Sequence, residues 1–300
     1  MVEIKNVVHV GAAGSLGAPI LKALIDSGKF NVTVLTRENS KSTFPSSVKV
    51  VKADYTSLDS VTAAFKGQDA VVSTVGTEGL LGQSLFIDAA IAAGVKRFIP
   101  SEFGSNLANP LTAALPIFGY KIATRKHIEA KVAGGADITY TYIQNGPFLD
   151  WGLQVNFLVD LRSGSPKIFD GGDQKVSATT LASIGTAVVG VLSHYDETKN
   201  RDVFIQDIAI SQNRIVEIAK KIKPEKAQEP VHVKTADTKA ASDAALAKGD
   251  YSEGTMFPYL FTAIFAEGYG NLYTKLDNEL VGLKPYTEAD VEALVKSILA

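Results

Sequence analysis

Three glycines at regular spacing follow the first apolar run of the chain. Gly11, Gly14 and Gly17 come directly after the apolar residues 7–10, and a run with helical apolar spacing begins at Ala18. In a strand–turn–helix unit, the first glycine permits a tight turn, the second lets the backbone approach a pyrophosphate, and the third lets the helix pack on the sheet. Amides at the helix N-terminus then face the anion. The pattern predicts a dinucleotide-binding turn.

Basic residues follow the second predicted strand, residues 32–35. Arg37 stands about 20 residues after Gly17, where an acidic residue binds the ribose 2′-hydroxyl of NAD and an arginine accommodates the 2′-phosphate of NADP. Its guanidinium can form bidentate hydrogen bonds to a phosphate, and Lys41 adds a second positive charge. The alternative is a solvated basic loop that Glu38 partly neutralises. Arg37 favours NADPH/NADP+ as the cofactor.

The elements that must position these residues alternate regularly through the first half. Strands are predicted at 7–10, 32–35, 48–51, 70–73, 97–99 and 138–143, and helices near 18–27, 58–65, 81–93 and 120–133. Such alternation predicts an α/β fold: a doubly wound parallel Rossmann sheet with helices on both faces. Ligands of this fold bind at the carboxyl ends of the strands.

Two further groups of candidate residues follow strands. Asp54, after the third strand, lies where this fold places a carboxylate against the adenine edge, and capping of the helix near Leu58 is an equal alternative. After the fourth strand, Thr74, Val75 and Gly76 are small enough for the nicotinamide half of the cofactor to pass along them. Both groups are predicted to belong to the cofactor site.

The stretch after the fifth strand carries a family resemblance. Residues 97–104, RFIPSEFG, resemble a signature of the isoflavone-reductase-like family. This family groups with the NmrA-like atypical short-chain dehydrogenases and includes plant pinoresinol-lariciresinol and phenylcoumaran benzylic ether reductases. Residues 92–96 and 139–148 and the G-x-x-G-x-x-G turn are also similar, so the likeness covers the first half. Ala13 stands where the family often has threonine, which removes a side-chain contact and leaves the amides in place.

The resemblance implies a catalytic lysine. Family members have one on the helix after the fifth strand, in a K-x-x-x-R pattern ahead of I-E-A, which Lys121 and Arg125 match here. Proton transfer near neutral pH requires the lysine pKa to fall from about 10.4 to about 7–8 through desolvation. The alternative for Lys121 is an exposed helix lysine. Arg125, one turn on, could bind substrate or cofactor, and a structural role is the preferred reading.

The Tyr-x-x-x-Lys pair of ordinary short-chain dehydrogenases is missing from this helix, because Tyr120 is followed four residues later by Thr124. The same spacing at Tyr195 and Lys199 is attributed to chance. Ser101 therefore has no tyrosine partner and is predicted to line the pocket. The predicted cofactor-binding residues are Gly11, Gly14, Ser15, Leu16, Gly17, Arg37, Lys41, Asp54, Thr74, Val75, Gly76, Ser101, Phe103, Asn145 and Phe148.

Composition excludes several classes. The 300 residues carry a net charge of −2, which offers no electrostatic case for nucleic acid or an anionic membrane. The sequence has no cysteine, and its four histidines show no metal-ligand spacing; His9, inside a strand, is predicted to be a core residue. No apolar run approaches the roughly 20 residues of a membrane span. We expect a soluble, cytoplasmic monomer or homodimer with a small-molecule substrate.

The second half is less regular. We expect an NADP-binding domain over 1–148 and a smaller substrate-binding lobe over 149–300, with a segment near 175–208, including a strand at 201–205, that could return to the main sheet. Residues 148–169 are expected to form part of the substrate wall, and the aromatic residues of 257–265 to fill a core. Helices are expected at 181–193, 211–221, 235–248 and 288–299.

Two functions are consistent with this sequence. The first is an NADPH-dependent reductase that transfers hydride to a small aromatic or phenolic substrate, with Lys121 as the proton-transfer residue. The second is an NmrA-like redox-sensing regulator that binds the dinucleotide without turnover and contacts a protein partner. A lysine at position 121 favours the enzyme.

Overall fold

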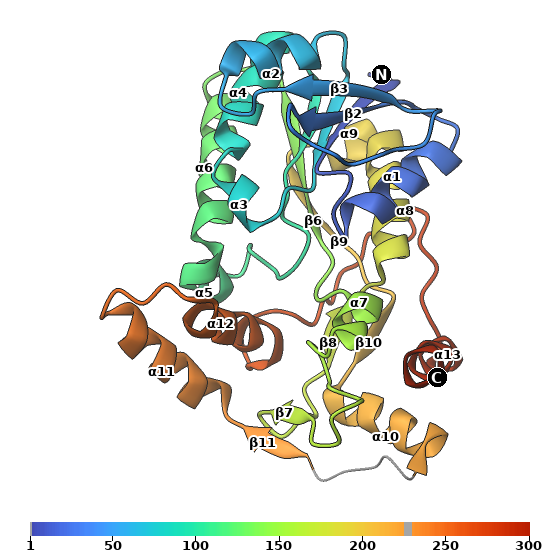
Figure 1. The fold of residues 1–300 in the computed structure, drawn as a ribbon, viewed down its shortest axis with the longest axis vertical. Coiled ribbons are helices and arrows are strands. Elements are labelled where there is room, and N and C mark those ends of the chain that lie inside the picture. The colour runs from blue at the N-terminus through green and yellow to red at the C-terminus, as the bar shows by residue number, and fades with distance from the viewer. Residues whose placement is uncertain (1, 225–229) are drawn as a thin grey trace.

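The structure is a computed structural model that describes residues 2–224 and 230–300. Its centre is a seven-stranded sheet in the order β3-β2-β1-β4-β5-β6-β9, in which every neighbouring pair is parallel (Figure 1). The strands are β1 Asn6–Val10, β2 Asn31–Arg37, β3 Lys49–Ala53, β4 Ala70–Ser73, β5 Arg97–Ile99, β6 Thr139–Gln144 and β9 Arg201–Phe204. The order reverses between β1 and β4, so the predicted doubly wound α/β fold is confirmed.

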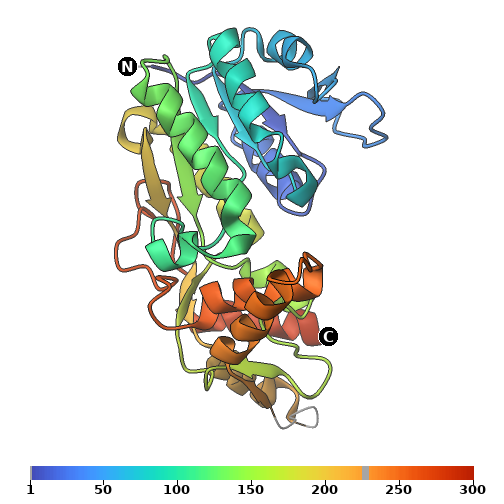
Figure 2. The same ribbon diagram turned by 90° about the vertical axis from the view of Figure 1, so that its left-hand side faces the viewer.

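Helices cover both faces of this sheet. One face carries α1 Gly17–Asp26 and α8 Leu181–Ser193, and the other carries α2 Leu58–Phe65, α4 Gln83–Ala93 and α6 Gly119–Ala133. Figure 2 shows α6 lying lengthwise over the sheet. Successive residues of β1 point to opposite cores: Val7 packs with α1 and α8, and Val8 packs with α2 and α4. Burial on both faces explains why the central strands read as continuous apolar runs.

The last strand of the sheet comes from the second half of the chain. β9 pairs with β6 in the register Thr141↔Arg201 to Gln144↔Phe204, so a strand from the segment expected to return does so. The short helix α9, Tyr195–Thr198, leads into it. The sheet therefore contains residues from both sides of the expected boundary at residue 148.

A buried arginine ties this returning segment to the sheet. Arg97 Nε donates to Thr139 Oγ1 at 2.8 Å, and Nη1 donates to the hydroxyls of Thr141 and Thr198 at 2.6 and 3.0 Å. Nη2 donates to the carbonyl of Tyr195 at 2.7 Å, and the guanidinium lies 4.5 Å from the Tyr195 ring centroid. Tyr195 thus packs against an arginine at the amino end of β5. This position agrees with the interpretation that the Tyr-x-x-x-Lys spacing of Tyr195 and Lys199 arose by chance.

Replacing Arg97 with Met should lower the free energy of unfolding by about 3 kcal/mol, because neutral acceptors at the β5–β6–α9 junction lose charged hydrogen bonds inside the protein. Urea denaturation measures the change. The matched control is Lys199→Met, which removes an exposed ion pair with Asp196 and should cost less than about 1 kcal/mol. Equal losses in the two variants would contradict a structural role for Arg97.

Small elements form the second lobe. β7 Lys167–Phe169 pairs in parallel with β11 Val231–Val233, and β8 Val176–Ala178 pairs antiparallel with β10 Ile208–Ile210. The helices around them are α7 Leu149–Gln154, α10 Gln212–Ile222, α11 Thr235–Leu246, α12 Glu253–Phe265 and α13 Glu288–Leu299. Residues of α7, α10, α12 and α13 share one apolar core, and α11 packs against α12 (Figure 1). No helix within residues 2–224 and 230–300 has the length and apolar content needed to cross a bilayer.

Several element boundaries differ from those predicted. β3 runs to Ala53 instead of residue 51, and the helix expected at 81–93 begins as a separate turn, α3 Thr77–Leu80, before α4. The short elements α5 Pro110–Ala113 and η1 Pro116–Phe118 were not predicted, and neither was α12. Pro258 lies inside α12 and breaks its sequence signal. Packing of Tyr259 and Ala263 against η1 stabilises this helix nonetheless.

Candidate functional site

The glycine turn has the geometry of a phosphate-binding loop. A Cβ on Gly11, whose φ is +84°, would lie 2.6 Å from the carbonyl oxygen of Thr74, and a Cβ on Gly17 would lie 2.1 Å from that of Gly11. A Cβ on Gly14 would have only one protein neighbour, the Gly11 carbonyl oxygen, at 3.4 Å, and Gly14 is exposed. Leu16 precedes α1 without a side-chain cap. A helix start without a side-chain cap fits a bound anion.

A buried histidine joins β1 and β4 where the strand order reverses. His9 Nε2 is 2.9 Å from Thr74 Oγ1, and that hydroxyl donates to the carbonyl of Val10 at 3.1 Å. Burial lowers the pKa of His9 to about 3, so its ring is neutral. Thr74 therefore uses its hydroxyl inside the protein, and His9 is the core residue that its strand position predicted.

Arg37 and Lys41 are both exposed at the carboxyl end of β2 and in the loop that follows. Neither side chain forms an ion pair within residues 2–224 and 230–300. Both the phosphate-binding reading and the solvated-loop reading predict exposed cations here. Their position at the carboxyl edge of the sheet is the one that the cofactor reading requires.

The structure corrects one alternative for Asp54. Its carboxylate accepts from the main chain and hydroxyl of Thr56 at 2.9 and 2.7 Å, and these bonds lower its pKa. The helix cap of α2 is Ser57, whose hydroxyl accepts from Ser60 N. Capping by Asp54 is therefore wrong, because Ser57 lies directly before the helix and Asp54 closes the preceding turn. Contact of the exposed Asp54 side chain with the adenine edge of the cofactor stays a prediction.

Loops after β4 and β5 are tied together by a serine and a glutamine. Ser101 Oγ donates to the carbonyl of Val75 at 2.8 Å, and Ser101 N donates to Gln83 Oε1 at 2.7 Å. Gln83 was not predicted, and its burial at the start of α4 is seen only in the structure. Ser101 thus ties the loop after β5 to Val75 in the loop after β4, and Gly76 beyond Val75 is exposed. Lining of a substrate pocket by Ser101 stays a prediction.

Lys121 lies in the first turn of α6 and points back at the loop after β5. Its Nζ donates to the main-chain carbonyl of Glu102, and the side chain is half-buried. Burial lowers the pKa of Lys121 to about 8, while the Glu102 carboxylate opposes this decrease and Arg125 adds to it. A lysine in this range holds and releases a proton near neutral pH, as general acid–base chemistry requires.

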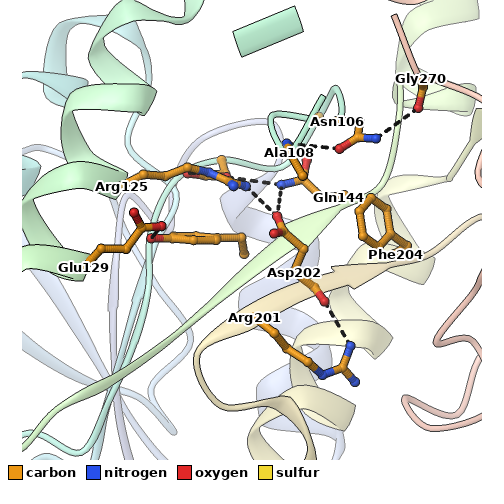
Figure 3. A network of polar contacts seen from close by, with 12 residues as sticks. Asn106, Ala108, Arg125, Glu129, Gln144, Arg201, Asp202, Phe204 and Gly270 are labelled. Carbon is orange, nitrogen blue, oxygen red and sulfur yellow. Dashed lines mark hydrogen bonds and ion pairs between the residues drawn. The ribbon is translucent and has the colours of Figure 1, made fainter. Parts of the chain in front are cut away.

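Glu102, whose carbonyl Lys121 contacts, also belongs to a charged network, and Figure 3 shows Arg125, Gln144 and Asp202 of that network. The Glu102 carboxylate, 2 % exposed, accepts from Arg125 Nε at 2.8 and 2.9 Å and from Nη2 at 2.6 Å. Arg125 Nη2 also donates to Asp202 Oδ1 at 2.6 Å. Gln144 Nε2 donates to Asp202 Oδ1 at 2.8 Å and to Glu102 Oε2 at 3.3 Å. Arg125 is therefore held between two carboxylates, and its structural role stays a prediction.

The remaining predicted residues line the end of β6 and the loop after β5. Phe103 is buried at a φ of +29°. Asn145 is fully buried; its Nδ2 donates to the carbonyl of Gly146, and among the described residues its Oδ1 has no hydrogen-bond partner. Phe148 is half-buried beside Trp151. These three side chains come from adjacent segments, since Gly104 bridges Gln144 of β6.

Tyr273 and Asp202 were missed by sequence reasoning. Tyr273 Oη donates to the carbonyl of Gly104 at 3.2 Å and accepts from Gly146 N at 2.9 Å. Both missed residues reach the site from distant parts of the chain, so only the tertiary structure shows their role. Within the described ranges, no three His, Asp or Glu side chains form a metal-binding group; His127 bonds instead to Asp88 at 2.9 Å.

Comparisons with known proteins identify the family of the chain. A sequence model of the NmrA-like family matches residues 3–240. The oxidoreductase aprR of Aspergillus flavus is 35% identical over 299 residues, 98% of each chain. The oxidoreductase poxI of Penicillium oxalicum is 40% identical over 217 residues, 70% of this chain and 68% of its own. The family match confirms the NmrA-like resemblance drawn from the sequence, and the chain is also similar to the isoflavone reductase homolog IRL of Zea mays, at 29% identity over 238 residues, 73% of this chain and 74% of its own.

Solved structures share the fold. AtPrR2 with NADP+ and (+)pinoresinol superimposes with a TM-score of 0.78 at 24% identity and covers 99% of this chain and 100% of its own. The chain therefore belongs to the NmrA-like family and is an oxidoreductase.

Proposed function

We propose that this protein is an NADPH-dependent reductase of a small aromatic or phenolic compound, with Lys121 as the residue that transfers the proton. The observation that carries the proposal is the half-buried Lys121 amine, held on the Glu102 carbonyl with a pKa lowered to about 8. An exposed structural lysine needs neither the burial nor the lowered pKa.

The chain's own residues fit the cofactor. The backbone of Gly11, Gly14 and Gly17 leaves room for a pyrophosphate at the start of α1, and Arg37 with Lys41 would bind the 2′-phosphate at the end of β2. Ser15 and Leu16 supply amides there, and residues 74–76 would line the nicotinamide half, with Ser101, Phe103, Asn145 and Phe148 around it. Bound NADPH supplies a hydride.

Lys121 supplies the matching proton. Below a pH of about 8 its amine is protonated, and it can donate to the substrate atom that gains negative charge when the substrate is reduced. The Glu102 carbonyl accepts from the same amine and so fixes where Nζ lies. One hydride and one proton together complete the two-electron reduction.

Aromatic side chains support the substrate class. Phe148 and Trp151 have ring centroids 6.2 Å apart, and Trp151 and Phe157 are 6.5 Å apart, all three half-buried on the segment expected to form the substrate wall. Rings arranged in this way favour an apolar, aromatic ligand. The structural neighbour AtPrR2 binds (+)pinoresinol, which supports the same class for this chain.

Arg37 should set the preference for NADPH over NADH. Replacing Arg37 with Ala should weaken NADPH binding about 10- to 100-fold, the effect of a lost charge-assisted hydrogen bond, and leave NADH binding unchanged. Isothermal titration of both dinucleotides measures this. The control Lys49→Ala removes an exposed cation at the amino end of β3, far from the ligand edge. A similar NADPH loss in both variants would mean that only general surface charge is involved.

The function itself is tested with the wild-type protein. NADPH, NADP+ and NADH are titrated into it, and NADPH consumption is followed with phenolic ethers, quinones and enones. Tight NADPH binding with turnover supports the reductase. Tight binding without turnover across the panel favours the redox-sensing regulator, and failure to bind any dinucleotide contradicts both functions.

A further inference from the structure

We propose that Glu102 and Asp202 are positioning residues for Lys121, and that Asp202 acts through Arg125 and Glu102 across the sheet. The inference deepens the proposed function, since it rests on Lys121 as the proton-transfer group. It concerns the second half of the chain, whose returning strand carries Asp202 into the Rossmann unit.

The first step is the contact between Lys121 and Glu102. The lysine donates to the main-chain carbonyl of the same residue whose carboxylate is buried against Arg125. Holding the Glu102 side chain therefore holds the carbonyl that positions Nζ. Phe103, the next residue, has a φ of +29°, an unfavourable backbone conformation for a bulky side chain that persists only when its surroundings fix it.

The second step is the link from Glu102 to Asp202. Arg125 places one nitrogen, Nη2, 2.6 Å from both carboxylates, and Gln144 donates to the same pair of groups. The Arg125 guanidinium also lies 3.9 Å from the Tyr142 ring centroid. Figure 3 shows Arg125 and Gln144 both directed at Asp202, while Arg201 turns to the Asp202 main-chain carbonyl. Strands β6 and β9, the β5 loop and α6 meet in this network.

The charged groups of the network affect the protonation of Lys121. Glu102 and Asp202 are the acidic groups of the network, and Arg125 is its cation. The two tyrosines on neighbouring elements, Tyr142 of β6 and Tyr273, stay neutral because burial raises the pKa of each phenol. Removing a carboxylate leaves Arg125 less compensated, so the protonated form of Lys121 becomes less favourable.

A positioning role and a purely structural role predict opposite changes in the Lys121 pKa. Loss of a structural contact lets water reach Lys121, and its pKa would rise toward that of a free lysine. Loss of a positioned negative charge lowers the pKa further. The sign of the change therefore distinguishes a positioning residue from a packing residue.

The experiment measures the Lys121 pKa directly by competitive acetylation of the apo protein with acetic anhydride over the lysine titration range, read by peptide mass spectrometry. Glu102→Gln should lower the pKa by about one pH unit, and Asp202→Asn should lower it by less. Asp202→Glu, which restores the charge, should return it toward the wild-type value. Thermal melting identifies variants that are folded at the labelling temperature.

The matched control is Asp277→Asn. Asp277 also pairs with an arginine at β9, Arg201, and its side chain is 20 % exposed against 21 % for Asp202. It lies outside the network, so the Lys121 pKa should not change. A higher Lys121 pKa in Glu102→Gln or Asp202→Asn, or the same value as in Asp277→Asn, would overturn the inference. Labelling needs no substrate, so a wild type without turnover would contradict the reductase and leave this test intact.

Discussion

Replacing Lys121 with Met is expected to lower kcat about 10²- to 10⁴-fold, the usual contribution of a positioned general acid, while NADPH affinity stays within about threefold of the wild type. Methionine preserves the apolar stem and removes the amine that the Glu102 carbonyl holds. The glycine turn and Arg37, which are predicted to bind the dinucleotide, are untouched. Steady-state NADPH oxidation and isothermal titration measure the two quantities separately.

The pH profile gives an independent check of the same role. If Lys121 donates a proton, kcat should fall as pH rises through the lysine pKa of about 8, because the fraction of protonated amine falls. Lys126→Met, which removes an exposed lysine of the same helix, should keep both the wild-type rate and its pH profile. A Lys121→Met enzyme with near wild-type kcat, or an equal loss in Lys126→Met, would exclude Lys121 as the proton donor.

Replacing Gly17 with Ala should prevent folding or cost about 3 kcal/mol of unfolding free energy or more. The added Cβ would lie 2.1 Å from the Gly11 carbonyl oxygen and 2.9 Å from Ala12 Cα, and both are backbone atoms that cannot move aside without deforming the turn. Urea denaturation followed by circular dichroism gives the loss.

Gly14→Ala is the matched comparison, because its Cβ would meet only ordinary van der Waals contact at 3.4 Å. This variant should fold with near wild-type stability and bind NADPH at least about tenfold more weakly, since the methyl group occupies the approach of a pyrophosphate. Normal NADPH binding by Gly14→Ala would remove the glycine turn from the cofactor site. Equal stability of Gly17→Ala and Gly14→Ala would contradict the packing argument.

The Rossmann half could be predicted because its signals are local. Apolar runs bounded by turns mark each strand, the glycine spacing marks the first helix, and α6 begins within one residue of its predicted start. Local signals fail where two nearby residues of the sequence could both cap the same helix. Asp54 and Ser57 are both good capping residues, and only the observed backbone shows that Ser57 caps α2.

The candidate site likewise contains some residues that a local motif marks and others that only the tertiary structure brings together. Lys121 is recognisable from a motif within one helix, and its lowered pKa follows from burial. The groups around it are not recognisable, because they are far apart in the chain: 77 residues separate Arg125 from Asp202, and 169 separate Gly104 from Tyr273. Neither Asp202 nor Tyr273 lies in a pattern that marks a functional residue, and α12 is obscured by its internal proline.

The late position of β9 in the chain affects how the protein is made. β6 is complete at Gln144, but its neighbour begins only at Arg201. During synthesis the hydrogen-bonding edge of β6 stays open until that later segment has left the ribosome, and open strand edges recruit other strands. A fragment ending near residue 148 would keep that edge permanently, so we expect it to associate with other strands more readily than the whole chain does.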